Sequence, residues 1–265
     1  YISFPTPGAS RQNGLLAPVL RWERDFGLNI KFPIYFSLAP HMDLTITPWI
    51  MEHFGNQLSA EYRRLTRFGE YKLTVSGART SMLDEHGTLD PNTLKSRGHV
   101  HSLGYFELPV TNAKSIFSYE IFRLRDDLKT YLKKYHIYDD DLLTSNASYY
   151  YFRNREYVTF DVIQFQGLRE FDSFAITPQA YPKVQHYKSF RLKPGISLSY
   201  FADFLHLYRS EGRNVDRIVV ESKLEGKKRV RAYNMEYFAS LRGDYYNSDE
   251  NNQDGFFINR YNAFR

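Results

Sequence analysis

The sequence predicts an all-β chain, an antiparallel β-barrel that crosses a membrane with its strands. Three observations point to this fold class. Apolar and polar residues alternate with a period of two, the aromatic content is high, and short connections between the expected strands alternate with long ones. Transmembrane β-barrels combine these three features, because each strand faces lipid with every second residue and the two ends of a barrel differ in loop length.

The alternation is clearest near the start of the chain. In the first expected strand, Leu28, Ile30 and Phe32 fall on one face, while Asn29 and Lys31 fall on the other. The same period recurs in six later segments, at residues 42–50, 58–63, 71–76, 117–121, 158–162 and 196–204. Such a series of strands joined by turns predicts an antiparallel meander.

The composition agrees with a barrel. Among 265 residues there are 22 Tyr and 21 Phe, and aromatic residues make up 17% of the chain. Tyr and Phe favour strands, and aromatic rings with a polar tip favour the membrane–water interface. Mean hydropathy is −0.53, and no apolar run reaches the ~18 residues that a membrane-spanning helix needs.

The connections alternate in length. Short ones are expected at residues 54–56, 67–70 and 153–155, and long polar ones at residues 81–96, 126–141 and 167–194. Within the second long connection, Leu128, Tyr131, Leu132 and Tyr135 have helical spacing, which predicts a short helix in that loop. Residues 247–254 are polar and are expected to form a turn or loop.

The sequence contains no complete set of catalytic or metal-binding residues, so we expect neither an enzyme nor a cofactor. His99 and His101 would share one face of a strand, as a metal site requires, but no further ligand is marked nearby, and two half-exposed strand histidines are the simpler interpretation. We interpret the three acidic residues at 139–141 as a solvated cluster in a loop. The basic residues at 227–229 indicate an exposed strand edge and not a nucleic-acid-binding site. Cysteine is absent, and the net charge of +5 is too small to identify a partner.

Two stretches carry a resemblance to a known family. The run FPTPGASRQNGLLAP at residues 4–18 and the run FPIYFSLAPHMDLTITPWIMEHFGNQLSAEYRRLT at residues 32–66 resemble the start of the β-barrel of the LPS-assembly protein LptD (OstA, organic solvent tolerance protein) family. Later stretches, at residues 143–145, 165–169, 178–182 and 208–212, look like the alphaproteobacterial branch of that family. Two positions depart from the pattern, Ile34-Tyr35 and the turn at Phe54-Gly55, and neither alters the strand periodicity.

The resemblance implies a domain organisation and a function. Residues 1–26 would lead into the barrel, and residues 27–265 would form the N-terminal part of the barrel domain, roughly its first ten strands. The chain lacks an N-terminal signal peptide, and a fragment is therefore expected. The family inserts lipopolysaccharide into the outer leaflet of the outer membrane of Gram-negative bacteria, with an LptE-like lipoprotein plug and an LptA-like periplasmic bridge that docks on a jellyroll domain.

The resemblance also implies roles for particular residues. Pro33 and Pro48, expected in the first and second strands, match the prolines that loosen a lateral gate, since proline cannot donate to the strand ladder. The polar residues of the first strands would line the lumen and contact sugars and phosphates: Asn29, Lys31, Asp43, Thr45, Glu61, Arg63 and Lys72. Two alternatives stay open, another outer-membrane barrel such as a porin or receptor, and a soluble carbohydrate-binding β-sandwich. In a barrel the apolar face stays uncovered, whereas in a sandwich it meets a second sheet.

Overall fold

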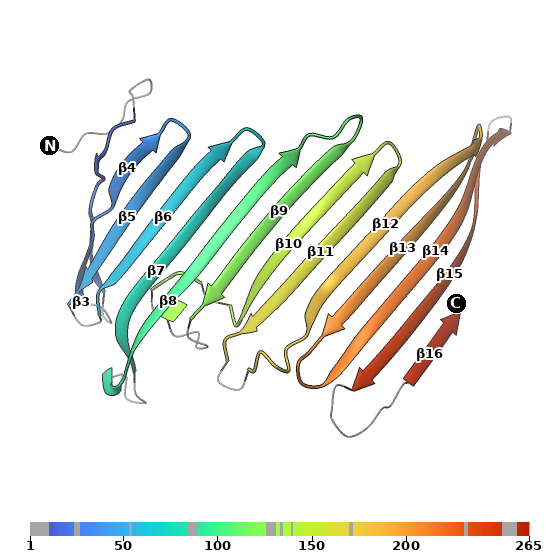
Figure 1. Cartoon of the computed structure of the whole chain (residues 1–265). Coiled ribbons are helices and arrows are strands. Elements are labelled where there is room, and N and C mark those ends of the chain that lie inside the picture. Colours follow the sequence, from blue (N-terminus) through green and yellow to red (C-terminus); the bar gives the residue numbers. More distant parts are fainter. Residues whose placement is uncertain are drawn as a thin grey trace. The chain divides into compact units, whose positions relative to one another are not determined.

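A computed structural model describes residues 11–23, 27–52, 55–83, 89–125, 131–132, 135–138, 140–169, 172–230, 233–250 and 259–264. These residues form an all-β, antiparallel structure in which, from β4 onward, each strand pairs with the next one in the sequence (Figure 1). The strands are β1 Gly14–Leu15, β2 Val19–Glu23, β3 Gly27–Lys31, β4 Ile34–Ala39, β5 Met42–Met51, β6 Gln57–Thr66, β7 Gly69–Leu83, β8 Leu89–Leu108, β9 Lys114–Leu124, β10 Leu142–Arg153, β11 Glu156–Gly167, β12 Gln179–Lys193, β13 Ile196–Tyr208, β14 Arg213–Val230, β15 Tyr233–Glu250 and β16 Asn259–Phe264. Within the described part of the chain, no helix is long and apolar enough to cross a membrane.

The chain divides into two compact units. The first holds residues 1–105, 119–143 and 166–171, and the second holds residues 106–118, 144–165 and 172–265. Strands β8 to β11 contribute residues to both units. Each unit is described separately below.

In the first unit, β5, β6 and β7 form a regular meander. Asp43 lies opposite Arg63 across the β5–β6 pair, and Arg63 lies opposite Lys72 across the β6–β7 pair. The connections at residues 40–41 and 67–68 are two-residue turns, whereas those at residues 52–56, 84–88 and 125–141 are longer. The short turns all lie at one end of the strands and the long connections at the other (Figure 1).

The first two rows of the sheet in this unit each consist of two short strands placed end to end, with Pro18 between β1 and β2 and Pro33 between β3 and β4. β3 and β4 lie in one row and keep a single register with β5, because Lys31 faces Trp49 and Ile34 faces Ile46 on either side of Pro33. β1 and β2 form the row before it, and their register with β3 and β4 slips by one residue between Leu15 and Val19, which places a bulge at residues 16–18. We call the pairing between these two rows, β1–β2 with β3–β4, the outer seam.

The outer seam corrects the expected placement of both prolines. Pro33 lies in the second row, not the first, and Pro48 lies in the third, inside the continuous strand β5. The expectation failed because β1 and β2 have only two and five residues, with Pro18 between them, and so show little alternation of their own. Both strands fall within residues 1–26, and most of the remainder of that segment, residues 1–10 and 24–26, lies outside the described residues.

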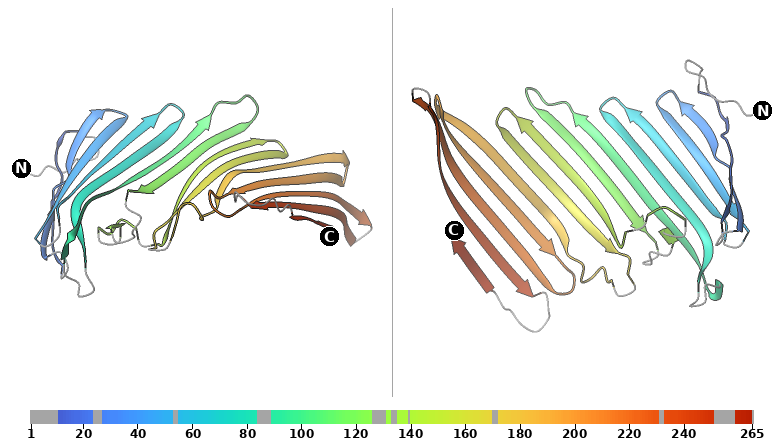
Figure 2. Two further views of the ribbon diagram at one scale, coloured as in Figure 1. Left: turned by 60° about the horizontal axis from the view of Figure 1, so that its bottom comes forward. Right: turned by 180° about the vertical axis from the view of Figure 1, so that it is seen from behind.

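In the second unit, β11 to β16 continue the meander in sequence order, each antiparallel to the next. Two-residue turns at residues 154–155 and 194–195 join β10 to β11 and β12 to β13. Gly195 has a φ of +80°, and a Cβ there would lie 2.5 Å from the carbonyl oxygen of Lys227, so this turn needs glycine. The two further views in Figure 2 show the same succession of hairpins.

Two expected connections and one expected tail are strands. Residues 81–83 and 89–96 extend β7 and β8, and residues 179–193 form β12, so the long loops expected at 81–96 and 167–194 are much shorter. Likewise, β15 continues to Glu250, into the expected polar tail. The physical reason is that backbone hydrogen bonds to a neighbouring strand hold these polar stretches extended, and a period-two apolar pattern is not needed for that.

The burial pattern is the reverse of that in a soluble protein. In the first unit Leu28, Ile50 and Leu58 are 53%, 47% and 55% exposed, whereas Asn29 and Asp43 are 1% and 4% exposed. In the second unit Phe160 and Val220 are exposed while Asp203 is buried. No second sheet covers the apolar face in either unit among the described residues, which contradicts the β-sandwich alternative and agrees with a barrel whose apolar face meets lipid.

Candidate functional site: the polar face of the first unit and its loop

The seven polar residues expected to line a lumen lie on one face of the first unit. The registers place Thr45 opposite Glu61 and Asp43 opposite Arg63, and directly opposed residues in an antiparallel pair share a face. Lys31 lies opposite Trp49, and Asn29 opposite Met51, on the same face. The sheet therefore brings all seven onto one surface, which we call the polar face.

Ion pairs link four of these seven residues and draw in the start of the chain. The Asp43 carboxylate accepts hydrogen bonds from Arg63, at 2.8 Å, and from Arg11, at 3.3 Å. Glu61 pairs with Lys72 at 2.8 Å. Asp43 is buried and these two arginines are its ion-pair partners, so Arg11 is held against the sheet ahead of β1.

Asn29 and Lys31 both contact Trp49. The indole N–H of Trp49 donates to the Asn29 side-chain oxygen at 3.1 Å, and the Lys31 ammonium lies 3.6 Å from the centre of the indole ring. These contacts cross from β3 to β5, and they connect the second row of the sheet to the third on the polar face. Sequence reasoning placed both residues correctly but did not identify the tryptophan as their partner.

The described residues of the loop between β9 and β10 (125, 131–132, 135–138 and 140–141) pack onto the polar face near the long-loop end of the strands (Figure 2). Tyr131 and Leu132 are helical, and the Tyr135 amide donates to the Tyr131 carbonyl at 3.1 Å, so the expected helical turn is present where the loop is described. Leu128 and Asp139 lie outside the described residues. Tyr131, Leu132 and Tyr135 are 1%, 0% and 2% exposed, and they pack in one apolar cluster with Trp49, Met51, Phe122, Leu124, Leu143 and Leu168.

Polar contacts attach the loop to two strands and to the connection between β5 and β6. The Tyr131 hydroxyl is 3.1 Å from the Gln57 amide nitrogen on β6 and 2.8 Å from the Ser76 hydroxyl on β7. The Tyr135 hydroxyl donates to the carbonyl of Gly55 at 2.9 Å. Burial raises the pKa of Tyr135 to about 12, because the phenolate would lose its hydration in this cluster.

The two strand histidines take different roles beside this loop. His99 is buried, its ring hydrogen-bonds to Ser76, and it lies 6.5 Å from the Tyr131 ring; the expectation of two half-exposed rings is therefore wrong for this residue. His101 pairs with Glu120 at 2.8 Å and stacks on Phe122. No cluster of three or more potential metal ligands occurs in the described part of the chain.

These features define a class of protein: a stretch of outer-membrane-type β-barrel, with an apolar face for lipid, a polar face for a lumen, and a loop folded against the polar face. Comparison with known proteins gives the family. The family model described as "LPS transport system D", LptD, matches residues 127–260, which is 134 of 265 residues and half of the chain. The chain belongs to the LptD family.

Curated relatives agree with the family model. The LPS-assembly protein LptD of Histophilus somni (strain 129Pt) is 30% identical over 185 residues, covering 69% of this chain and 22% of the relative. That of Pseudomonas aeruginosa (strain LESB58) is 37% identical over 97 residues, covering 37% of the chain and 10% of the relative. That of Ralstonia nicotianae (strain ATCC BAA-1114 / GMI1000) is 42% identical over 57 residues, covering 22% and 7%. The matches span at most about a fifth of these relatives' length.

Proposed function

We propose that this chain is part of a non-enzymatic translocon that assembles lipopolysaccharide in the outer membrane of a Gram-negative bacterium. The observation that carries the proposal is the polar face, which buries Asn29 and Asp43 while the apolar side chains opposite remain exposed. A lumen of this kind suits a substrate with a charged sugar part and an acylated part, because the sugars can pass along the polar face while the acyl chains meet the lipid. The relatives named LPS-assembly proteins support this assignment over a porin or receptor.

In this proposal the rows β1–β2 and β3–β4 begin the barrel, the residues before β1 lead into it, and the described strands are its N-terminal part. The sugars and phosphates of the substrate would contact the polar face, at Asn29, Lys31, Asp43, Thr45, Glu61, Arg63 and Lys72. A lipoprotein of the LptE kind would occupy the lumen, and an LptA-like bridge would deliver the substrate from the periplasm. The short turns at residues 40–41 and 67–68 would then face the periplasm, and the longer connections the cell exterior.

Lateral opening would occur at the outer seam. The Pro33 carbonyl accepts from the Leu16 amide at 2.8 Å, so Pro33 faces the β1–β2 row, to which it cannot donate a hydrogen bond of its own. The Pro48 carbonyl accepts from the Phe32 amide at 3.0 Å, so Pro48 removes one bond from the next pairing inward, β3–β4 with β5. The outer seam combines Pro33 with the bulge at residues 16–18, so it is weaker than the pairing of β3–β4 with β5.

The test substitutes these prolines in the full-length protein. Each alanine restores one possible donor, worth about 0.5–1.5 kcal/mol net. We expect Pro33→Ala to slow the appearance of newly made lipopolysaccharide at the cell surface more than Pro48→Ala does, and the double variant to raise sensitivity to large antibiotics. Pro109→Ala, in the exposed turn between β8 and β9, is the matched control. Export at the wild-type rate in the double variant would contradict opening at these pairings.

A further inference from the structure

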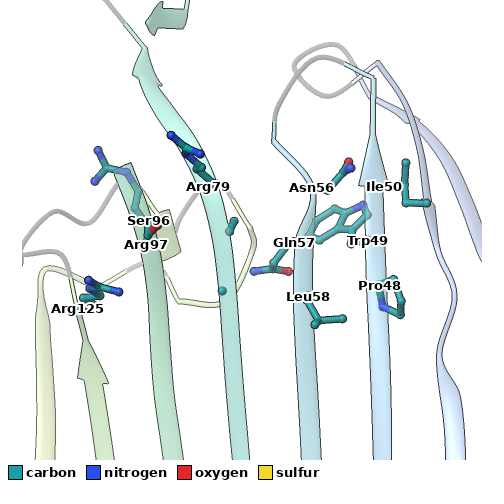
Figure 3. A pocket seen from close by; sticks show the side chains of 12 residues that line it. Pro48, Trp49, Ile50, Asn56, Gln57, Leu58, Arg79, Ser96, Arg97 and Arg125 are labelled. Carbon is teal, nitrogen blue, oxygen red and sulfur yellow. The ribbon is translucent and has the colours of Figure 1, made fainter. Parts of the chain in front are cut away.

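A groove lies on the apolar face of the first unit, opposite the loop, near the long-loop end of β5 to β8. Its volume is about 540 Å³, and Figure 3 shows the side chains that line it. The registers fix which of these side chains point outward: Pro48 lies opposite Leu58, and Leu58 opposite Gly77, so these three share the apolar face. Ile50 and Arg79 lie two residues further along their strands and share it as well.

The groove is apolar toward the middle of the strands and carries cations at its rim. Its inner part holds Pro48 and Leu58, with no side chain at Gly77. Gly98 on β8 adjoins Gly77, since a Cβ there would lie 3.5 Å from the Gly77 Cα, and the pair leaves a shallow trough. The two glycines thus leave a strip of backbone without side chains, where another chain can approach the sheet closely.

The rim is formed by one residue each from β7 and β8 and by the residues that directly precede β6 and follow β9. Arg79 and Arg125 are both exposed, neither forms an ion pair with another described residue, and Asn56 and Ser96 add polar groups beside them. In Figure 3 Arg79 and Asn56 lie nearer the loops, whereas Arg125 lies about level with Leu58 and Pro48. The Arg125 amide donates to the Gly98 carbonyl at 3.0 Å, so Arg125 flanks the trough, and Arg79 lies two residues beyond Gly77 on β7. Arginines that flank an apolar trough suit an anionic headgroup with attached acyl chains, since arginine binds phosphate in bidentate fashion.

We propose that this groove binds one phosphorylated, multiply acylated lipid of the outer leaflet, with Arg79 and Arg125 on its phosphate and an acyl chain over Gly77 and Gly98. The proposal rests on the proposed function, because that function sets which end of the strands faces outward. The groove lies on β5–β8, a few strands of ~4.8 Å spacing away from the outer seam. Arg79, on β7, lies three strands from the β3–β4 row, and Arg125, just after β9, lies five, which is about 14 and 24 Å along the sheet. A lipid that leaves the seam would reach these arginines by moving along the apolar face, and the site would hold it on the lipid side of the barrel.

The binding experiment uses the full-length protein with its lipoprotein partner in nanodiscs and measures retained lipid by native mass spectrometry. The probe is bisphosphorylated hexa-acyl lipid A, and the comparison lipids are the same molecule without phosphates and phosphatidylglycerol. We expect Arg79→Ala/Arg125→Ala to weaken retention of the phosphorylated probe by about tenfold or more, since two charge-assisted hydrogen-bonding groups are lost. Arg67→Ala/Arg153→Ala, two exposed arginines in or beside the short turns, should retain the probe as the wild type does.

A second variant tests the trough independently of charge. At Gly77 an added Cβ meets nothing closer than a carbonyl oxygen at 3.8 Å, so the Gly77→Leu variant should fold. Its leucine side chain should fill the trough and weaken retention of the lipid A probe, although both arginines are still present. Equal retention by the arginine double variant and the wild type would overturn the proposal. So would equal retention of the dephosphorylated lipid, or equal retention of phosphatidylglycerol.

A separate readout distinguishes failure of the site from failure of the proposed function. Surface lipopolysaccharide is measured in cells that depend on the full-length protein. If the wild-type protein supports surface lipopolysaccharide but the arginine variant binds lipid A normally, only the groove assignment fails. If cells with the wild-type protein do not display lipopolysaccharide at their surface, the proposed function itself fails.

Discussion

Substitution of Tyr131 should release the loop at residues 125–141 from the polar face. The side chain is 1% exposed, and its hydroxyl contacts Gln57 and Ser76 at 3.1 and 2.8 Å. Tyr131→Phe leaves those two polar groups without that partner in a buried place, at a cost of about 1–3 kcal/mol. Tyr131→Ala also removes the ring from the apolar cluster, and the cost rises to about 3–5 kcal/mol.

Hydrogen exchange measures this loss directly. The amides of Tyr135 and Ile137 donate to the carbonyls of Tyr131 and Leu132, so both are protected only while the helical turn is closed. A loss of ~1.4 kcal/mol lowers protection about tenfold, so Tyr131→Phe should lower it by about five- to 150-fold, and Tyr131→Ala by considerably more. The measurement uses the full-length protein in nanodiscs.

The control removes the same hydroxyl at an exposed site. Tyr246 on β15 is 38% exposed, and Tyr246→Phe should leave protection of the loop amides unchanged. Unchanged protection in both Tyr131 variants would refute the inference that this side chain anchors the loop. A drop for Tyr131→Ala without one for Tyr131→Phe would mean that ring packing, not the hydroxyl contacts, holds it.

Three further predictions concern the same unit. Asp43→Asn should lower the free energy of unfolding of the full-length protein, measured by urea titration, by about 1–3 kcal/mol, because Arg63 and Arg11 lose a buried anionic partner. Glu61→Gln, which removes the half-exposed ion pair with Lys72, should lower it by only about 0–1 kcal/mol. Burial raises the pKa of Tyr135 to about 12, so the folded loop favours the neutral phenol. The stability that the buried Tyr135 side chain contributes is therefore complete below pH ~10 and is lost as the pH rises toward 12. Phenolate absorbance should therefore show a late transition that Tyr135→Phe removes, and a transition that persists in that variant would assign it to another tyrosine. Gly55→Ala should loosen the β6–β7 end and lower loop protection, since its Cβ would lie 2.1 Å from the Arg79 carbonyl oxygen, whereas Gly14→Ala, with nothing within 4 Å, should be neutral.

The period-two pattern predicted the strands wherever one side of the strand is apolar. It placed β5, β6, β7 and β13 because Leu44, Ile46, Leu58 and their equivalents alternate with polar residues that share the other face. It missed β12 and the outer parts of β7 and β8, where the strand is held by backbone pairing and the side chains carry no such alternation. It also missed β1 and β2, which are short and divided by proline.

For the site, the sequence predicted which residues share the polar face but not what they touch. Successive residues of a strand alternate between its two faces, so Asn29, Lys31 and Asp43 could be assigned to the polar face from local sequence alone. The partners could not, because Tyr131 meets Gln57 and Ser76 across 74 and 55 residues of sequence, and Tyr135 meets Gly55 across 80. The helical spacing of Tyr131, Leu132 and Tyr135 did predict a short helix in the loop, but not that these side chains are buried against the sheet.

The placement of the loop bears on how the outer seam could open. Its buried contacts are with β5, β6, β7 and β9, through Trp49, Gln57, Ser76 and Phe122, and these lie behind the seam. One contact of its described part with the β1–β2 row is the pair His136–Glu23, 3.4 Å apart, in which the histidine side chain is 61% exposed. An exposed pair of this length contributes about 0–1 kcal/mol, far less than the buried cluster. In the proposed lateral opening, the β1–β2 row would separate at its bulge and at Pro33 while the buried cluster keeps the loop on the strands behind the seam. We therefore expect lateral opening and loop release to have different free-energy costs.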